Sequence, residues 1–226
     1  MVELITGLDA SRMRANLEQL REQIDATAVH SASNRGDRGR VEILAAVKYV
    51  ASNQLAALHE AGIRLVGENR AQDLQEKAAA HPGLFEWHFI GQLQSRKVKA
   101  IVPYVRLIHS VASESALREL ERHRELAMPG MEILLEVNVA GEEGKAGIVP
   151  AEIDRYIEAS SFPVAGLMTM PPLASDPEDS RRWFAALREL ADERGLLQLS
   201  MGTSQDHLVA VQEGATIVRI GTSLYD

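Results

Sequence analysis

The stretch Val41-Glu42-Ile43-Leu44-Ala45-Ala46-Val47-Lys48 decides how the rest of the sequence is interpreted. Its apolar residues are almost unbroken, which is typical of a strand buried on both faces of a parallel sheet. The run ends on one lysine, and a helical pattern begins near Ser52. Because ligands bind at the carboxyl ends of strands in parallel α/β folds, Lys48 is a candidate functional residue.

The chemistry open to Lys48 depends on what surrounds it. A lysine whose stem lies against apolar side chains and whose amine lies in a pocket is held in the neutral form, which can attack a carbonyl to form a Schiff base. A solvated lysine that only ends a strand is the alternative interpretation. The other strands decide which of the two is favoured.

Length and composition limit the class of protein. The chain has 226 residues, of which 46% are hydrophobic and 25% charged, as in an ordinary globular domain. The net charge is −8 and the basic residues are scattered, so neither nucleic acid nor an anionic membrane is an expected partner. No secretory signal, membrane span or cysteine chemistry is predicted. We therefore expect one cytoplasmic domain over residues 1–226.

Helical and strand-like patterns alternate along the chain. An amphipathic helix is predicted from Asp9 to about Asp25, followed at residues 31–40 by an arginine-containing segment that we interpret as a mobile, solvated loop. Strands are then predicted at residues 41–48, 63–66, 85–90, 105–111, 132–139, 164–168, 197–200 and 216–220. With the first helix replacing the one missing after the last strand, this pattern predicts a single closed (β/α)8 barrel. An open doubly wound sheet is the alternative.

Polar side chains gather after the predicted strands, where a barrel places its functional residues. Glu68 and Asn69 follow the second strand, and Asn138 lies at the end of the fifth. His88 and His109 lie in the third and fourth strands, and the histidines show no spacing typical of metal ligands. We therefore predict no metal site, and interpret these two histidines as strand-end residues with satisfied hydrogen bonds.

The tripeptide Gly-Thr-Ser occurs twice, as Gly202-Thr203-Ser204 after the seventh strand and as Gly221-Thr222-Ser223 after the eighth. The loops after these two strands commonly hold a phosphate in barrels, because glycine admits close approach while amides and hydroxyls donate hydrogen bonds. Two ordinary turns are the alternative. Beside a strand-end lysine, however, the repeat favours an aldehyde cofactor that bears a phosphate.

Arg219 precedes the second of these glycines and would project from the eighth strand toward the barrel mouth. Beside a pyridine ring it would donate to the ring nitrogen and keep that nitrogen unprotonated. A structural salt bridge, for example to Glu68, is the competing explanation.

The sequence resembles the pyridoxal phosphate homeostasis proteins, the YggS/PROSC-like family, over essentially its whole length. The matching segments are Leu44-Ala45-Ala46-Val47-Lys48, Gly67-Glu68-Asn69-Arg70-Ala71-Gln72, Trp87-His88-Phe89-Ile90-Gly91, Leu93-Gln94-Ser95, Ile108-His109-Ser110-Val111, Val137-Asn138-Val139, Lys145-Ala146-Gly147, Gly166-Leu167-Met168-Thr169-Met170, Leu199-Ser200-Met201-Gly202 and Val218-Arg219-Ile220-Gly221-Thr222. The departures are Gln92 for proline, Arg96 for asparagine and Thr203 for methionine, of which only Thr203 adjoins the expected phosphate loop.

This resemblance implies a barrel of the alanine racemase N-terminal type, with pyridoxal 5'-phosphate held as an aldimine on Lys48. It also implies that Asn69 lines the cofactor ring and that Arg219 faces the ring nitrogen. The remaining predicted cofactor-binding residues are Ser204, Gly221 and Thr222 around the phosphate, together with His88, Ser200 and Met201.

The resemblance further implies a carrier that buffers pyridoxal phosphate and maintains its intracellular balance, with no catalytic residue and no established turnover. Pyridoxal-phosphate-dependent apo-enzymes are the partners that such a role suggests. An amino-acid racemase dependent on this cofactor, and a Schiff-base aldolase acting on a sugar phosphate, are the alternatives. Because the sequence stops at Asp226, directly after the eighth strand, we expect no second domain and a monomer.

Overall fold

The computed structural model describes residues 4–225, in which eight parallel strands close into a barrel. The strands are β1 (Glu42–Ala46), β2 (Leu65–Glu68), β3 (Glu86–Phe89), β4 (Leu107–Val111), β5 (Glu132–Glu136), β6 (Val164–Met168), β7 (Gln198–Thr203) and β8 (Ile217–Ile220). β1 pairs with both β2 and β8, so the sheet has no free edge. The predicted barrel is therefore confirmed, and residues 1–3 and 226 of the predicted domain lie outside the described range.

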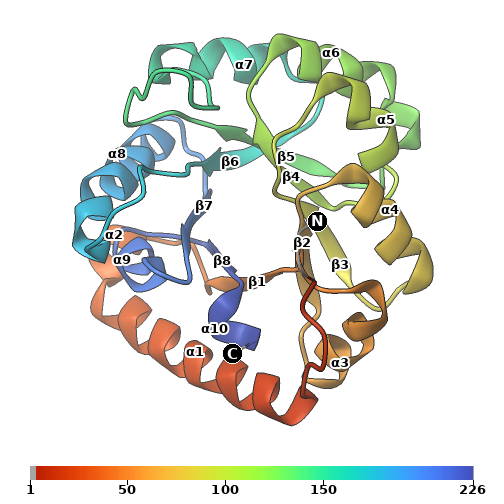
Figure 1. The fold of residues 1–226 in the computed structure, drawn as a ribbon. Helices are drawn as coiled ribbons and strands as arrows, with labels where there is room; N and C mark the ends of the chain where they lie inside the picture. Colours follow the sequence, from red (N-terminus) through yellow and green to blue (C-terminus); the bar gives the residue numbers. More distant parts are fainter. Residues whose placement is uncertain (1–3, 226) are drawn as a thin grey trace.

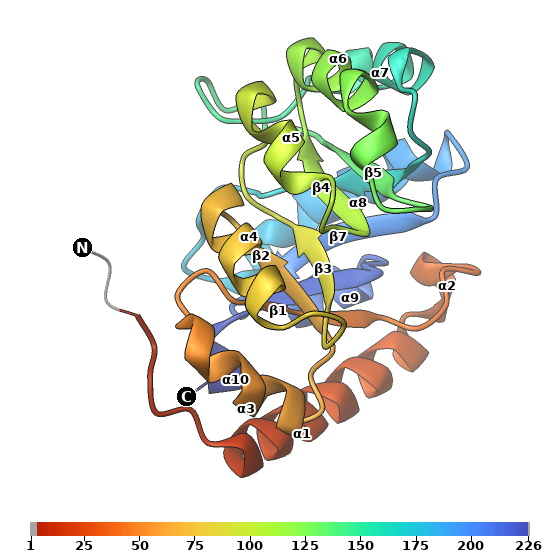
Figure 2. The same cartoon turned by 90° about the vertical axis from the view of Figure 1, so that its right-hand side faces the viewer.

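Helices surround the barrel as an outer ring (Figures 1 and 2). They are α1 (Ala10–His30), α3 (Leu55–Glu60), α4 (Ala71–Ala80), α5 (Val98–Ile101), α6 (Glu114–Arg122), α7 (Ile153–Ala159), α8 (Arg181–Asp192) and α9 (His207–Gln212), with short turns α2 (Ala32–Arg35) and α10 (Thr222–Tyr225). Single 3₁₀ turns lie at Ser52–Gln54, Ser95–Lys97, Arg124–Leu126, Pro150–Glu152 and Pro177–Ser180. Within the described part of the chain, no helix has the length and apolar character needed to cross a bilayer.

The first helix closes the ring as the sequence predicts. The Asp9 side chain caps α1 by accepting hydrogen bonds from the backbone N–H groups of Ser11 and Arg12. The buried face of the helix carries Met13, Leu20 and Ile24, and it packs against α9, α10 and α3. α1 thus covers the barrel wall between its last and first strands.

Alternation along each strand separates two apolar layers. Ile43 and Ala45 of β1 face the helices and belong to the main core, whereas Leu44 points into the barrel. There it meets residues from other strands, namely Leu107, Leu134, Met168 and Ile217. Full burial of such a side chain contributes about 1.5–3 kcal/mol, so these layers fix which strand residues face the barrel interior.

The arginine-containing segment at residues 31–40 is exposed at most of its positions, but it is not wholly the solvated loop that was predicted. Its first residues form α2, and the Arg35 guanidinium is buried. This group donates to the carbonyl oxygens of Ala215 at 2.6 Å and Gly39 at 2.8 Å. Charge patterning did not reveal this anchoring, because the acceptors are backbone carbonyls, one of them far away in the sequence.

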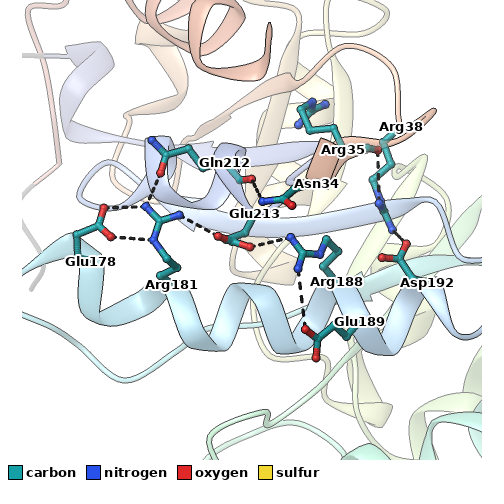
Figure 3. Close-up of polar contacts among 10 residues, drawn as sticks. All are labelled: Asn34, Arg35, Arg38, Glu178, Arg181, Arg188, Glu189, Asp192, Gln212 and Glu213. Carbon is teal, nitrogen blue, oxygen red and sulfur yellow. Dashed lines mark hydrogen bonds and ion pairs between the residues drawn. The ribbon is translucent and has the colours of Figure 1, made fainter. Parts of the chain in front are cut away.

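An ion pair ties the same region to α8, and a hydrogen bond from Asn34 Nδ2 to the Gln212 carbonyl oxygen at 3.1 Å ties it to α9, as Figure 3 shows. Arg38 pairs with Asp192 at the end of α8. Glu213, just after α9, accepts hydrogen bonds from Arg181 and Arg188, each at 2.8 Å. Segment 31–40 is therefore packed beside a charged cluster that joins the two helices.

Candidate functional site

A cavity of about 480 Å³ opens at the carboxyl ends of the strands. This volume lies within the range that is usual for small-molecule sites, about 300–1,000 Å³. The predicted cofactor-binding residues that line it are Lys48, Asn69, Ser204, Arg219, Gly221 and Thr222. A cavity of about 530 Å³ at the opposite end of the barrel is no smaller. The candidate site is therefore identified by the functional side chains that meet there, and not by its volume.

Lys48 lies at the rim of this cavity and is exposed. β1 ends at Ala46, so Lys48 occupies a turn beyond the strand. Its Nζ lies 4.5 Å from the centroid of the Tyr49 ring. The expectation of an amine sheltered by apolar side chains was therefore wrong, because a turn residue escapes the packing of the strand. The site instead offers an amine that an incoming molecule can reach directly.

A buried lysine that the sequence analysis missed holds the two loops carrying Lys48 and Asn69. Lys77 of α4 donates from Nζ to the Val47 carbonyl oxygen at 2.7 Å and to Glu68 Oε2 at 2.6 Å. Glu68 Oε1 in turn accepts from the Asn69 backbone N–H at 2.6 Å. One ammonium group thus fixes the residues that directly precede both predicted cofactor residues.

A sequence signal for Lys77 existed but was not used. Lys77 falls on the apolar face of α4 together with Ala71, Leu74 and Ala78, at helical spacing. Because Glu68 is engaged by Lys77, the competing explanation for Arg219, a salt bridge to Glu68, is also wrong.

Asn69 brings an unsatisfied polar atom to the cavity. Its Oδ1 is buried and has no hydrogen-bond partner among residues 4–225. The Asn69 backbone packs tightly against Gly91, because a Cβ on Gly91 would lie 2.0 Å from the Asn69 carbonyl oxygen. Since buried acceptors are normally paired, the free oxygen is available to a donor on a bound molecule.

The two Gly-Thr-Ser loops meet at the cavity wall. The Gly221 backbone N–H donates to Ser204 Oγ at 3.2 Å, which joins the second tripeptide to the first. A Cβ on Gly221 would meet no described heavy atom within 4 Å, so this backbone borders open space. The predicted convergence of the loops after β7 and β8 is present in the structure.

The other residues of the first tripeptide serve close packing, at Gly202, and the turn before α9, at Thr203. Gly202 has φ of 90°, and a Cβ there would lie 2.6 Å from Ala210 Cβ. The Thr203 backbone N–H and hydroxyl donate to Asp206 Oδ1 at 2.7 and 3.0 Å. Thr203, the departure from the family pattern, therefore directs its hydroxyl to the turn before α9.

Arg219 is buried on β8 and is held by neutral acceptors. Its Nη1 donates to the Ser200 carbonyl oxygen at 2.8 Å and to Ser200 Oγ at 2.6 Å, while Nη2 donates to the Thr169 carbonyl oxygen at 2.9 Å. Burial lowers the pKa of Arg219 to about 10, against the opposing effect of Asp206 and Glu136. The guanidinium therefore remains a cation at neutral pH.

Three predicted cofactor-binding residues lie behind the cavity wall. Ser200 is fully buried beneath Arg219, and His88 is hydrogen-bonded to His109 inside the barrel. Met201, the next residue after Ser200, faces the opposite side of β7 and packs in the outer core. The structure thus brings six of the predicted residues together at the cavity and sets these three apart.

Glu136 and Tyr225 also line the cavity and were not predicted. Burial raises the pKa of Glu136, while the positive charges of Arg219 and Lys145 oppose that shift. The Tyr225 hydroxyl donates to the Ala46 carbonyl oxygen at 3.1 Å, and burial raises the pKa of Tyr225. Within residues 4–225, no group of three or more His, Asp or Glu side chains is placed to hold a metal ion.

Comparison with known proteins defines the class first. The sequence matches the family described as alanine racemase, N-terminal domain, over residues 8–226. The solved alanine racemase from Acinetobacter baumannii aligns with a TM-score of 0.67 at 14% identity, covering 96% of this chain and 62% of that chain. The chain is thus a barrel of the alanine racemase N-terminal type.

More similar relatives then identify the family within that class. A pyridoxal phosphate homeostasis protein from Aquifex aeolicus is 41% identical over 210 residues, which are 87% of this chain and 92% of the relative. PipY of Synechococcus elongatus, solved with PLP bound, has a TM-score of 0.75 at 29% identity and covers 95% of this chain and 100% of that chain. This chain belongs to the pyridoxal phosphate homeostasis protein family.

Proposed function

We propose that this chain binds pyridoxal phosphate at the mouth of the barrel and serves to buffer and hand on the cofactor. The observation that supports this proposal is one cavity lined by a reachable amine, a buried guanidinium and two joined Gly-Thr-Ser loops. Each of these elements matches a different part of the cofactor. The relatives' name and the PLP-bound PipY structure support the same assignment.

The residues present fit the chemistry of the cofactor. When bound, pyridoxal phosphate supplies an aldehyde that an amine can attack and an aromatic ring that withdraws electrons. Lys48 provides the amine, and Asn69 offers its unpaired Oδ1 to a donor of the ring. Arg219 presents a cationic donor to the ring nitrogen.

The phosphate would be held without any added positive charge. Ser204, Gly221 and Thr222 supply hydroxyl and backbone N–H donors, and the side of Gly221 toward the cavity is open. Uncharged donors bind an anion with less Coulomb energy than a lysine or arginine clamp. This composition suits a protein that has to release the cofactor as well as bind it.

The same residues support a carrier over an enzyme. A guanidinium facing the ring nitrogen does not protonate it, so the ring stabilises a neighbouring carbanion less well. Tyr225 is a poor candidate for a base, because burial raises its pKa and its hydroxyl is engaged by Ala46. We therefore assign no catalytic residue.

The proposed carrier role also has an oligomeric state and a cellular compartment. A single chain supplies the amine, the guanidinium and both phosphate loops, which supports function as a monomer. Transfer of the cofactor to pyridoxal-phosphate-dependent apo-enzymes requires the same compartment, and we propose the cytoplasm. Light scattering of the purified protein and fractionation of cells test these two statements, and a dimer or an exported protein would contradict them.

Titration of the purified protein with pyridoxal phosphate, followed by absorbance, tests the binding proposal. We expect Lys48→Ala to abolish the visible band of the covalently held cofactor. Lys99→Ala is the matched control, because Lys99 is exposed on α5 and does not line the cavity. An unchanged band in the Lys48 variant would overturn the assignment.

A racemisation assay tests the carrier proposal against the racemase alternative. The purified protein loaded with pyridoxal phosphate is incubated with L-alanine or L-serine, and the D-isomer is quantified. We expect no enzyme-like turnover. Sustained turnover that disappears in Glu136→Gln would show that the buried carboxyl acts as a base, and the protein would then be a racemase.

A further inference from the structure

A file of hydrogen-bonded side chains crosses the barrel beneath the cavity. His88 Nδ1 lies 3.0 Å from His109 Nε2, and His109 Nδ1 lies 2.8 Å from Ser200 Oγ. Ser200 Oγ then accepts from Arg219 Nη1 at 2.6 Å. At the other end, His88 Nε2 lies 3.2 Å from Glu86 Oε1. Because Glu86 is the first residue of β3, the file runs from the N-terminal end of the barrel to the cavity floor.

When both histidines are neutral, the two ends of the file fix the position of every hydrogen, because the Glu86 carboxylate can only accept and the Arg219 guanidinium can only donate. Ser200 Oγ accepts from Arg219, and because two neutral rings ending on Glu86 leave His109 Nδ1 without a hydrogen, the Ser200 hydroxyl donates to that nitrogen. His109 consequently carries its proton on Nε2 and donates it to His88 Nδ1. His88 in turn carries its proton on Nε2 and donates it to the Glu86 carboxylate. All donors point from Arg219 toward Glu86.

The surroundings of His109 favour its neutral form. His109 is completely buried, and burial together with His88 and Arg219 holds its pKa well below the usual value. The hydrogen bond from His88 is the main reason why the pKa of Glu86 is lowered. The file therefore joins a cation at the cavity to a carboxylate at the far end, with a neutral His109 between them.

We propose that Glu86, His88, His109 and Ser200 form a directional hydrogen-bond relay that positions the Arg219 guanidinium at the floor of the cavity. They are positioning residues, since none of them lines the cavity. The effect on the cofactor rests on the proposed function, whereas the relay itself does not.

A buried arginine that faces a ligand has to be held in one orientation without losing its positive charge, and the relay meets both requirements. Within residues 4–225, Arg219 has no ion-pair partner. A carboxylate directly beside the guanidinium would orient it but would also neutralise the charge offered to the ring nitrogen. A chain of hydrogen bonds polarises its members, so Glu86 strengthens Ser200 as an acceptor from a distance. Arg219 is oriented and keeps its charge.

Nitrogen NMR of protein labelled with ¹⁵N-histidine tests the relay directly, in wild-type protein free of cofactor. Correlations between ring protons and ring nitrogens show which nitrogen carries hydrogen. We expect His88 and His109 both to be neutral and protonated on Nε2 at neutral pH. A proton on Nδ1 of either ring, or a charged ring, would overturn the proposal. This readout stands even if pyridoxal phosphate does not bind.

Variants test whether the relay acts on the cavity. We expect Ser200→Ala to weaken pyridoxal phosphate binding on the order of tenfold, the loss expected for a hydrogen bond to a charged group. It should also shift the absorbance of the bound cofactor, whereas Ser200→Thr, which keeps the hydroxyl, should restore both. Ser180→Ala is the control, because Ser180 is equally buried but lies outside the barrel.

A substitution at the far end separates a relay from simple packing. Glu86 is half-exposed and remote from the cavity, so a purely structural role predicts no effect of Glu86→Ala on the cofactor. The relay predicts binding weakened by a few fold, with an altered His88 ring signal. Glu132→Ala, at the first residue of β5, is the control. Equal affinity in the Glu86 and Glu132 variants would contradict the proposal.

Discussion

Two buried cations at the carboxyl end of the barrel are held in opposite ways. Lys77 donates to the Glu68 carboxylate at 2.6 Å, so its positive charge is balanced by a directly adjacent negative charge. Arg219 is equally buried but donates to neutral oxygens of Ser200 and Thr169. A cation with a carboxylate partner serves the fold, whereas one left without a counter-charge at a cavity is available to a ligand.

The location of each cation agrees with this difference. Lys77 lies between α4 and the strand ends, where it ties the loops after β1 and β2 together. Arg219 lies inside the barrel and lines the cavity. Substitutions at the two positions should therefore separate stability from binding, and the predictions below test that separation.

The largest effect is expected from Lys77→Met, which leaves the buried Glu68 without its cationic partner. Breaking one side of a buried ion pair costs about 3–5 kcal/mol in the free energy of unfolding. Urea denaturation measures this loss. Lys99→Met, at an exposed position of α5, should change stability by less than about 0.5 kcal/mol. A loss below about 1 kcal/mol in the Lys77 variant would mean that the pair contributes little.

A smaller loss of stability is expected from Gly202→Ala. The residue has φ of 90° and its Cβ would lie 2.6 Å from Ala210 Cβ, so strain and overpacking together should cost about 2–4 kcal/mol. Gly221→Ala is the matched control, because its Cβ enters open space. That variant should keep its thermal midpoint yet bind pyridoxal phosphate more weakly. Equal stability losses in both variants would show that the two glycines do not differ in role.

Arg219→Met should cost less stability than Lys77→Met, about 1–2 kcal/mol, since it removes hydrogen bonds to neutral groups and breaks no ion pair. Its main effect should appear in a pyridoxal phosphate titration, as weaker binding and a shifted absorbance band. The contrast between the two cations would fail if Arg219→Met were the more destabilising variant, or if it bound the cofactor as the wild type does.

The smallest effect concerns Glu136, whose pKa burial raises above that of the unfolded chain. A raised carboxyl pKa favours the protonated form in the folded state, so stability falls as the pH rises from the unfolded pKa to the folded pKa, and the full cost remains above it. Glu136→Gln removes that cost. The variant should gain stability relative to the wild type between pH 4 and pH 7, as measured by urea denaturation. A gain in stability that is the same at every pH would contradict the raised pKa of Glu136.

The barrel could be predicted from sequence because strand and helix periods alternate with few interruptions. The loops after β7 and β8 could be predicted as well, since the repeated tripeptide marks both. The direction of individual side chains could not. Ser200 and Met201 are adjacent yet face opposite sides of β7, and the matching segment gave no reason to separate them.

Long-range polar partners were the other limit. Arg35 lies in a polar stretch and Lys77 on the apolar face of α4, and the acceptors of both, such as Ala215 and Val47, are brought near only by the fold. The prediction that apolar side chains surround the Lys48 amine was wrong for a related reason. Its exposure depends on β1 ending at Ala46, a boundary that the apolar run does not show.

Borohydride reduction of the protein with bound pyridoxal phosphate, followed by peptide mapping with mass spectrometry, tests the central claim most directly. Reduction makes the covalent link permanent, so the modified residue can be read from the peptide mass. The account predicts one modification per chain, on Lys48. A modification at another lysine, or none at all, would contradict the site described at the barrel mouth.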